Sequence, residues 1–253
     1  MDTLSTKQVV RVCPKCSSFG FIGPVQPRNH PPNQVTWCDC RVGQCERAHW
    51  EKEYLQRRRA VVASLFTDSC IPVEYESATI DRLLSLKDGD KAAAIAAATE
   101  LIDTGEVGGK NSLCVIGEYG VGKTYLLSAV LRTYLDGGES GLWLALAELF
   151  RDVQRGYSQG NDMADQRIDA ACNAGVLMID DFGRVDISGM ETTDKVRIID
   201  TIINYRHNMR KPTLITSNLG PDGWAEQFGR RTADRVYKMC AVVRMGGQNL
   251  RLI

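Results

Sequence analysis

Several features that would assign a chain to a broad class directly are missing from this 253-residue sequence. No apolar run approaches the length of a membrane span, and the N-terminal segment lacks the apolar core of a signal peptide. Acidic and basic residues balance at 31 each, so no global field draws the protein to nucleic acid or membrane. We therefore expect a cytoplasmic protein in which any DNA binding is local.

What the sequence has is an ordinary globular composition, with 43% hydrophobic and 25% charged residues, and an uneven distribution of cysteine. Five of the nine cysteines fall between Cys13 and Cys45. In a cytosolic chain such clustering indicates a metal site rather than disulfides. Cys70, Cys114, Cys172 and Cys240 lie in or near apolar segments, where we expect buried packing residues.

The chain divides into two predicted regions. Residues 1–66 are expected to form a small N-terminal zinc-binding region followed by a charged linker helix over 44–66. Residues 67–253 alternate between strand and helix patterns, which is typical of an α/β fold with a parallel sheet. The strands are expected at 112–117, 142–146, 176–180 and 212–218, the helices at 123–135, from about 147 and at 193–208, and a closing hairpin around Gly246–Gly247.

A phosphate-binding loop is predicted between the first of these strands and the helix that follows it. Gly117, Gly122, Lys123 and Thr124 match the Gly-x4-Gly-Lys-Thr pattern of P-loops. Its backbone N–H groups would bind phosphate oxygens, Lys123 would reach the β- and γ-phosphates, and Thr124 would ligate Mg²⁺. The competing interpretation is a plain glycine-rich turn, which the flanking strand and helix disfavour. The expected nucleotide-binding residues are Gly117, Glu118, Tyr119, Gly120, Val121, Gly122, Lys123, Thr124 and Tyr125.

Two later strands end in polar residues that complete the predicted site. Asp180 and Asp181 close the strand at 176–180, where Asp180 would hold Mg²⁺ and Asp181 would polarise a water for hydrolysis. Asn218 ends the strand at 212–218 at the expected level of the γ-phosphate, so its amide would orient that water. A solvated acidic turn and a simple Ser-Asn turn are the structural alternatives. Because the Asn-Lys-x-Asp guanine-reading element is missing, ATP is favoured over GTP.

The cysteine cluster has the composition of a zinc site. Cys13 and Cys16 form a Cys-Pro-x-Cys knuckle, and Cys38 and Cys40 follow in a tighter Cys-x-Cys pair. Four thiolates would stabilise a region with so little apolar material. Cys45 remains an alternative to Cys38 or Cys40, His30 is a weaker candidate, and unliganded thiols are the remaining possibility.

The segments GEYGVGKTYL, VLMIDDFG, IINYRHNMRKPTLITSNL and GRRTADRV together resemble the AAA+ ATPases of the DnaC/DnaI helicase-loader and IstB transposition-helper group. The similarity runs from about Ile71 to the C-terminus, and Cys70 stands where the group usually has glycine. The resemblance implies a three-layer AAA+ fold with Asp180 as the Walker B magnesium ligand. It also implies that Asp181 takes the place of the usual catalytic glutamate, which suits slow, switch-like hydrolysis, and that Asn218 is sensor 1.

Two arginines acquire roles from the same resemblance. Arg235 matches the arginine finger that such proteins insert into a neighbour's ATP site, which implies a homo-oligomer. Arg251 resembles the sensor 2 arginine, although Asn249 and Leu250 depart from that pattern. A guanidinium suits both roles because it stabilises charge developing on γ-phosphate oxygens. A surface ion pair is the simpler interpretation of either residue.

The resemblance also implies partners. In helicase loaders the region before the ATPase domain binds the replicative helicase, so residues 1–66 become the expected partner-binding region. Single-stranded DNA is a second expected partner, with Arg151, Arg155 and Tyr157 as candidate contacts. The Arg57–Arg59 run is more simply a solvated helix face. The runner-up function is an IstB-like ATP-binding helper of a transposase, and a more remote alternative is a small-molecule P-loop kinase, against which the Asp-Asp pair and the lack of a lid-like insertion count.

Overall fold

The computed structural model describes residues 13–24, 31–86, 88–160, 162–183 and 190–250. Contacts divide the chain into two compact units, residues 1–61 and 62–253, which we describe separately. Helix α1 (Arg41–Asp68) passes from one unit to the other. It includes the whole helix expected over 44–66.

The first unit is small and held by short-range contacts around its cysteines. After Cys13 the chain turns tightly, with Ser17 N donating to Cys13 O and Phe19 N donating to Cys16 O. An antiparallel bridge joins Phe21 to Trp37, and a 3-10 turn, η2 (Pro32–Gln34), lies between these two residues in the sequence. Few apolar side chains are buried here, so the cysteine cluster and the first turns of α1 form the centre of the unit.

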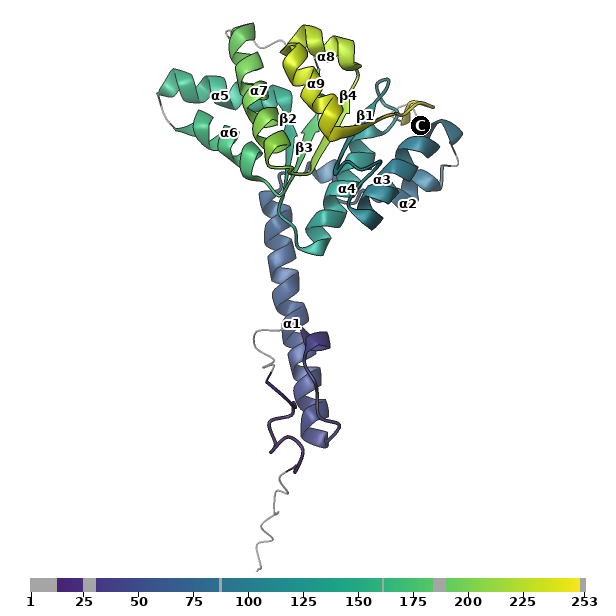
Figure 1. The fold of residues 1–253 in the computed structure, drawn as a ribbon, viewed down its shortest axis with the longest axis vertical. Coiled ribbons are helices and arrows are strands. Elements are labelled where there is room, and N and C mark those ends of the chain that lie inside the picture. Colours follow the sequence, from purple (N-terminus) through teal and green to yellow (C-terminus); the bar gives the residue numbers. More distant parts are fainter. Residues whose placement is uncertain (1–12, 25–30, 87, 161, 184–189, 251–253) are drawn as a thin grey trace, which may run out of the picture. The chain divides into compact units, whose positions relative to one another are not determined.

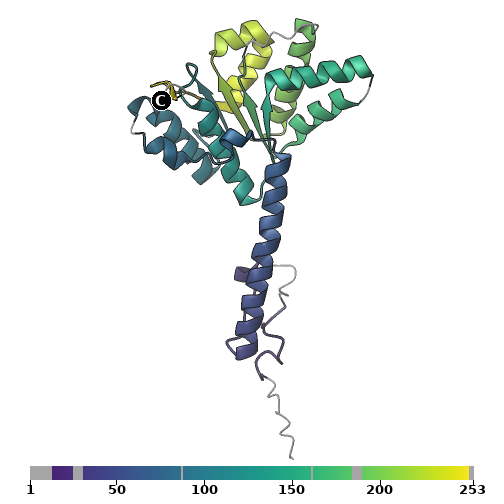
Figure 2. The same cartoon turned by 180° about the vertical axis from the view of Figure 1, so that it is seen from behind.

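The second unit contains a five-stranded, fully parallel sheet of order β2-β3-β4-β1-β5. Figures 1 and 2 show this sheet with helices on both sides. The strands are β1 (Ser112–Ile116), β2 (Gly141–Ala145), β3 (Val176–Asp180), β4 (Thr213–Ser217) and β5 (Cys240–Arg244). The helices and 3-10 turns are η3 (Val73–Tyr75), α2 (Ile80–Leu84), η4 (Gly89–Lys91), α3 (Ala92–Thr104), α4 (Lys123–Gly137), α5 (Leu146–Gln159), α6 (Met163–Asn173), α7 (Thr192–Asn208), α8 (Pro221–Phe228) and α9 (Arg230–Met239).

Alternating strand residues send their side chains into two separate apolar cores, one on each face of the sheet. Leu113 and Val115 of β1 pack with α3 and α4, whereas Cys114 between them packs with the layer of α5 to α9. This period-2 alternation is the geometry of a β-strand buried on both faces. The predicted three-layer α/β architecture is therefore confirmed, and the four predicted strands all occur within a residue or two of their expected bounds.

The predicted C-terminal hairpin is wrong. β5 pairs with β1 in parallel, with Cys240 opposite Ser112 and Arg244 opposite Ile116. Within the described residues no strand follows β5. The glycines at 246 and 247 instead turn the chain toward the phosphate loop, where Leu250 N donates to Gly120 O at 2.8 Å. An apolar run followed by Gly-Gly is compatible with a hairpin and with a parallel strand that ends in a turn. Only the tertiary pairing of the strand distinguishes these two structures.

The expectation for the isolated cysteines holds for three of four. Cys114, Cys172 and Cys240 are buried, but Cys70 is exposed and has a left-handed φ of 56°. A left-handed backbone is most easily adopted by glycine. This explains physically why glycine is usual at that position in the group that the sequence resembles. No described helix is both long and apolar enough to cross a membrane.

Candidate nucleotide and metal sites

The phosphate loop joins β1 to α4 at the carboxyl edge of the sheet. Gly122 has φ 103°, a conformation that L side chains rarely adopt, and α4 begins at the next residue, Lys123. The loop thus delivers the N-terminus of a 15-residue helix to the pocket. Helix N-termini offer unpaired N–H groups and a partial positive charge, both suited to phosphate.

Lys123 and Asn218 meet at the centre of this edge. The Lys123 ammonium is buried and donates to Gly117 O at 3.0 Å, Glu118 O at 2.7 Å and Asn218 Oδ1 at 2.7 Å. Asn218 Nδ2 in turn approaches Asp181 Oδ1 at 3.4 Å. The structure therefore brings together three of the predicted catalytic residues: Lys123 at the start of α4, and Asp181 and Asn218 directly after β3 and β4.

Asp180 is held by two hydroxyl groups. Thr124 Oγ1 donates to Asp180 Oδ1 at 2.8 Å, and Thr216 Oγ1 donates to the same oxygen at 2.7 Å. Burial raises the pKa of Asp180, while these hydroxyl bonds act in the opposite direction. Hard oxygen ligands on Thr124 and Asp180 are the donor set that Mg²⁺ prefers. The residues present therefore fit a magnesium ion bound beside a nucleotide.

Asp181 is positioned by its backbone. Its φ of 53° is left-handed, and its N–H donates to Thr216 Oγ1 at 2.9 Å. Thr216 thus binds the Asp180 carboxylate and the Asp181 backbone at once. Sequence reasoning missed this residue because a threonine inside an apolar strand looks like an ordinary β-former; its one signal is a polar side chain next to the strand end.

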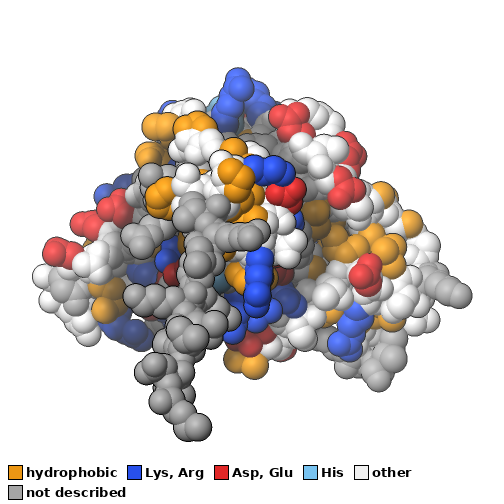
Figure 3. Space-filling view, turned by 90° about the horizontal axis from the view of Figure 1, so that it is seen from below, with side chains coloured by type: hydrophobic (Ala, Val, Ile, Leu, Met, Phe, Trp, Pro, Cys, Tyr) orange, Lys and Arg blue, Asp and Glu red, His pale blue; other side chains and the backbone are white. Residues whose placement is uncertain are grey.

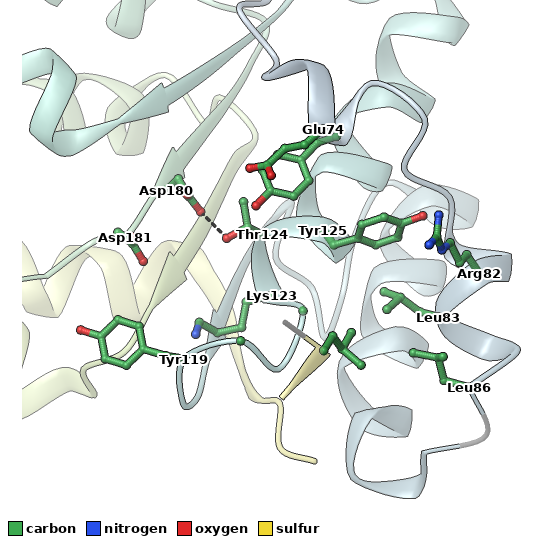
Figure 4. Close-up of a pocket in the computed structure, with 14 residues that line it drawn as sticks. Glu74, Arg82, Leu83, Leu86, Tyr119, Lys123, Thr124, Tyr125, Asp180 and Asp181 are labelled. Atoms are coloured by element: carbon green, nitrogen blue, oxygen red, sulfur yellow. Dashed lines mark hydrogen bonds between the residues drawn. The ribbon is translucent and has the colours of Figure 1, made fainter. Parts of the chain in front are cut away.

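A cavity of about 640 Å³ lies between the phosphate loop and the α2 region, a volume suited to a nucleotide. In Figure 4, Asp180, Asp181 and Tyr119 lie on one side of this cavity, and Tyr125, Arg82, Leu83 and Leu86 lie on the other. The Arg82 guanidinium is 6.0 Å from the centre of the Tyr125 ring. The second side supplies apolar and flat surfaces of the kind that bind a base. Tyr125 there was an expected nucleotide-binding residue, whereas the sequence pattern did not indicate Arg82, Leu83 or Leu86.

The C-terminal strap, residues 245–250, is anchored next to the phosphate loop by a buried ion pair. Lys91 is fully buried and binds Asp88 Oδ2 at 2.5 Å, and its ammonium also donates to Gly246 O at 3.2 Å and Gln248 O at 3.5 Å. Gly247 has φ 97°, and a Cβ there would collide with the Asp88 carboxylate. The hydrogen bond from Lys91 is the main cause of a lowered pKa at Asp88. We call this buried Lys91–Asp88 pair the Lys91 clamp. It fixes the strap, and Leu250 at the end of the strap lines the nucleotide cavity.

Of the two predicted arginines, Arg235 lies away from the pocket of its own chain. Its Nη1 binds Asp200 Oδ1 at 2.7 Å, next to Thr232 Oγ1, which donates to the same oxygen at 2.9 Å. Arg235 is on α9 and does not line the nucleotide cavity. Arg251 lies outside the described residues.

In the first unit, Cys13, Cys16, Cys38 and Cys40 form one cluster whose sulfurs all lie within 4.8 Å of one another. The Cys13 and Cys38 sulfurs are 3.8 Å apart, and the Cys16 and Cys40 sulfurs are 3.6 Å apart. Tetrahedral ligation with Zn–S bonds of about 2.3 Å requires separations of about 3.8 Å, so the cluster fits zinc. Backbone N–H groups of Cys16 and Lys15 lower the pKa of Cys13 to about 7, which favours a thiolate ligand. Cys45 is exposed and outside the cluster, and His30 lies outside the described residues.

The fold and this site define an AAA+ P-loop ATP-binding protein. The chain belongs to the family of IstB-like ATP binding proteins, whose profile matches residues 88–253. It is 24% identical over 205 residues to the replicative helicase loader DnaI of Bacillus subtilis (strain 168), and the aligned region covers 74% of this chain and 63% of DnaI. It is 29% identical over 121 residues to the replicative helicase loader DnaC of Buchnera aphidicola subsp. Baizongia pistaciae (strain Bp), covering 47% and 48% of the two chains.

Solved structures agree on the fold. A crystal structure of DnaI aligns with a TM-score of 0.60 at 26% identity over 72% of this chain and 95% of that one. A crystal structure of the DnaC helicase loader aligns with a TM-score of 0.58 at 24% identity over 69% of this chain and 100% of that one. The predicted resemblance to this group is therefore confirmed. The chain spans about half to two thirds of the length of the curated relatives named here.

A first prediction concerns the buried carboxylate. A carboxyl group with a raised pKa in the folded state destabilises the fold at pH values above its unfolded pKa, so charged Asp180 opposes folding at neutral pH. Asp180→Asn should raise the melting temperature by about 2–4 °C, as expected for roughly 1 kcal/mol in a domain of this size. It should also abolish magnesium-dependent ATP turnover. Differential scanning fluorimetry and a phosphate-release assay measure the two effects, and a lower melting temperature would contradict the first.

The cysteine cluster gives a second prediction. Cys16→Ser should reduce bound zinc from one ion per chain to none, because a three-thiolate shell leaves the metal site open. Elemental analysis of the purified protein provides the measurement. Cys45→Ser is the matched control and should keep its zinc. Loss of the metal in the Cys45 variant would show that the ligand set is different.

The buried clamp gives a third prediction. Lys91→Met keeps an unbranched side chain one atom shorter but removes the ammonium that holds the strap, so the KM for ATP should rise about tenfold with a smaller change in kcat. Leu101→Ala, which opens a cavity in the same buried layer, serves as a control for lost stability alone. If both variants lower the melting temperature equally and neither changes KM, the strap does not position the nucleotide.

Proposed function

We propose that this protein is a slow ATP-hydrolysing switch that places a replicative ring helicase on DNA. The observation that carries the proposal is the contact chain Lys123–Asn218–Asp181 beside the Thr124–Asp180 pair. These residues combine a phosphate-binding cation, a metal-binding pair and a carboxylate aligned with an amide. The relatives DnaI and DnaC are both named replicative helicase loaders.

In the proposed reaction, the Lys123 ammonium leaves the carbonyl oxygens of its own loop and binds the β- and γ-phosphates of ATP. Thr124 and Asp180 hold Mg²⁺, which when bound neutralises charge on the phosphate oxygens. Asp181 accepts a proton from the attacking water, and Asn218 orients that water through its amide. Aspartate is shorter than the glutamate usual at this position, so Asp181 reaches less far and hydrolysis is slow, as a switch requires.

Arg235 is proposed to act on the ATP bound by a neighbouring copy. One observation supports this: Arg235 lines no part of its own chain's nucleotide cavity. Its side chain is 15% exposed in the pair with Asp200, so the proposed role requires that pair to open. ATP-driven assembly would exchange that intrachain pair for the γ-phosphate of the neighbour. The protein is therefore proposed to form an ATP-dependent homo-oligomer. Arg251 keeps its proposed sensor 2 role.

The first unit is proposed to bind zinc through its four clustered cysteines and to contact the helicase. Its exposed apolar side chains support this role, because Phe19 is 69% and Ile22 is 38% exposed on a unit with a small core. Residues 1–66 would thus provide the partner-binding region and residues 67–253 the ATP-dependent switch.

The alternative function is an ATP-binding helper of a transposase. It is favoured by the profile match, which is to the IstB-like family over residues 88–253. The two functions share the ATP site and differ in the partner. Affinity capture of the tagged protein with ATP, against a purified ring helicase and a purified transposase from the same source, distinguishes them. Capture of the transposase alone would contradict the loader proposal.

A fourth prediction tests the shared site between subunits. Lys123→Ala lacks a working pocket and Arg235→Ala lacks the finger, so each alone should lose at least tenfold in ATP turnover. Mixing the two should restore activity, because an Arg235→Ala subunit keeps an intact pocket that a Lys123→Ala neighbour can complete.

The rate of phosphate release, measured at several mixing ratios of the two variants, tests whether they restore each other's activity. An Arg197→Ala variant, which changes an arginine that is 67% exposed and paired with Asp194, is the matched control and should turn over ATP normally. If the mixture stays inactive while each variant remains folded, Arg235 does not act on a neighbouring copy.

A further inference from the structure

A second cavity lies at the amino edge of the sheet, opposite the nucleotide pocket. Its volume is about 390 Å³. Lys110 and Asn111 approach it just before β1, Lys211 just before β4, and the C-terminal ends of α7 and α9 form its other walls. We call it the basic pocket. Its lining residues are Glu106, Gly109, Lys110, Asn111, Arg206, His207, Arg210, Lys211, Lys238 and Met239.

The charge of this pocket is strongly one-sided. Five permanent cations line it against the single carboxylate of Glu106, although the whole chain has 31 basic and 31 acidic residues. Figure 3 draws one face of the molecule, on which both basic and acidic side chains occur. Among the described residues, no carboxylate lies within ion-pair distance of any of the five. Such a concentration of like charge attracts anions locally even on a neutral protein.

Three of the five cations are fixed by main-chain carbonyls. Arg206 is fully buried and donates to Ala171, Cys172, Ala174, Gly175 and Pro212 carbonyls, and Lys211 donates to Asn173 O at 2.9 Å. Lys110 donates to Tyr237 O at 2.8 Å and Cys240 O at 2.9 Å. These bonds close helix ends, which is a structural role. Burial lowers the pKa of Arg206 to about 10, so it stays charged at neutral pH without a counter-ion.

Two exposed cations, Arg210 and Lys238, lie at the rim, and within the part of the chain that the structure describes neither ammonium nor guanidinium is bonded to a carbonyl. Arg210 has a left-handed φ of 49°, and its carbonyl accepts a hydrogen bond from Asn111 Nδ2 at 2.6 Å. This contact fixes the backbone from which the side chain projects. Lys238 lies in the last turn of α9. The three bonded cations thus make the inside of the pocket positive, and the exposed Arg210 and Lys238 side chains can bind an anion at its rim.

An exposed aromatic ring adjoins the basic pocket. Tyr237 is 56% exposed, and the Lys110 ammonium lies 5.3 Å from the centre of its ring. A charged groove next to an aromatic platform is the arrangement that binds single-stranded nucleic acid, with phosphates on the cations and a base stacked on the ring. A duplex would present no unpaired base to the ring, and a free phosphate would make no use of it.

We propose that the basic pocket binds the backbone of single-stranded DNA through Arg210 and Lys238, with a base stacked on Tyr237. The inference rests on the proposed function, because a loader must hold the strand on which it places the helicase. It assigns that contact to the edge of the sheet opposite the ATP site. Tyr237 and Arg235 are two residues apart on α9, so they project to different sides of the helix, and both can be engaged together.

The candidate contacts on α5 are less suited to this task. Arg155 lies 3.8 Å from the Asp152 carboxylate, and Arg151 Nε donates to the carbonyl of Ala147. Tyr157 is 48% exposed, but within the described residues no cation is recorded over its ring. The two candidate surfaces can therefore be separated by matched variants.

Fluorescence anisotropy with a labelled oligo-deoxythymidine tests the proposal in the presence of a non-hydrolysable ATP analogue. The double variant Arg210→Asn/Lys238→Gln should weaken binding at least tenfold, with asparagine chosen because it tolerates a left-handed backbone. Loss of two phosphate contacts should also lower the salt slope of the affinity by about 1.4. Tyr237→Ala should weaken binding about tenfold, whereas Tyr237→Phe should retain it.

Arg151→Ala/Arg155→Ala is the matched control and should bind within about twofold of the parent protein. Melting temperatures show whether each variant is folded, and Arg210→Lys/Lys238→Arg should restore binding if the first pair lost it through charge alone. The proposal would be overturned if the basic-pocket variants bound DNA with the affinity of the parent protein. It would also be overturned if only the Arg151→Ala/Arg155→Ala variant lost DNA affinity. Stronger competition by duplex DNA or by pyrophosphate than by single strands would also overturn it.

ATP turnover and helicase capture by the parent protein are measured in parallel. If the parent neither turns over ATP nor captures a helicase, the proposed function fails independently of DNA binding. If both occur and the basic-pocket variants bind DNA as tightly as the parent, the function stands and the assigned DNA site is wrong.

Discussion

The contact between the Lys123 ammonium and the Asn218 carboxamide is the interaction on which the rest of the site depends. It joins the phosphate loop after β1 to the end of β4, the neighbouring strand of the sheet. Because parallel strands end at one edge, side chains far apart in the chain meet there without any long loop. Asp180 and Asp181 arrive at the same place from β3, on the other side of β4. The chemistry thus follows from strand order, and the two apolar cores exist to hold that order.

This arrangement has a cost in stability that function explains. Asp180 is nearly buried, and its pKa is raised by loss of hydration, so the native state carries an unfavourable charge. Thr124 and Thr216 reduce that cost by donating to the carboxylate. Lys91 is a second buried charge, and it is fully compensated by Asp88 and two carbonyls of the strap. The Asp180 carboxylate is a ligand of the type that fits Mg²⁺, whereas the Lys91 ammonium fixes structure.

Much of this could be predicted from sequence because the relevant signals are local. The phosphate loop, the carboxylates at the end of 176–180 and the cysteine knuckle each combine residue types and spacings with a direct physical meaning. The resemblance added roles for Arg235 and Arg251, which remain proposals. The hairpin prediction failed because parallel pairing of β5 with β1 joins residues more than a hundred positions apart. Thr216, the Lys91 clamp and the basic pocket were missed because they bring distant segments together, and a lysine or threonine alone carries no signal. The Lys91–Asp88 pair is local, but the strap carbonyls that it binds are more than 150 residues away.

The central claim is that each bound ATP lies between two copies of the chain. A structure of the protein with a non-hydrolysable ATP analogue and Mg²⁺ tests it most directly. The account predicts an assembly in which Arg235 has left Asp200 and contacts the γ-phosphate held by Lys123 of the adjacent copy. A solitary subunit whose own residues complete the pocket, with the Arg235–Asp200 pair intact, would contradict it.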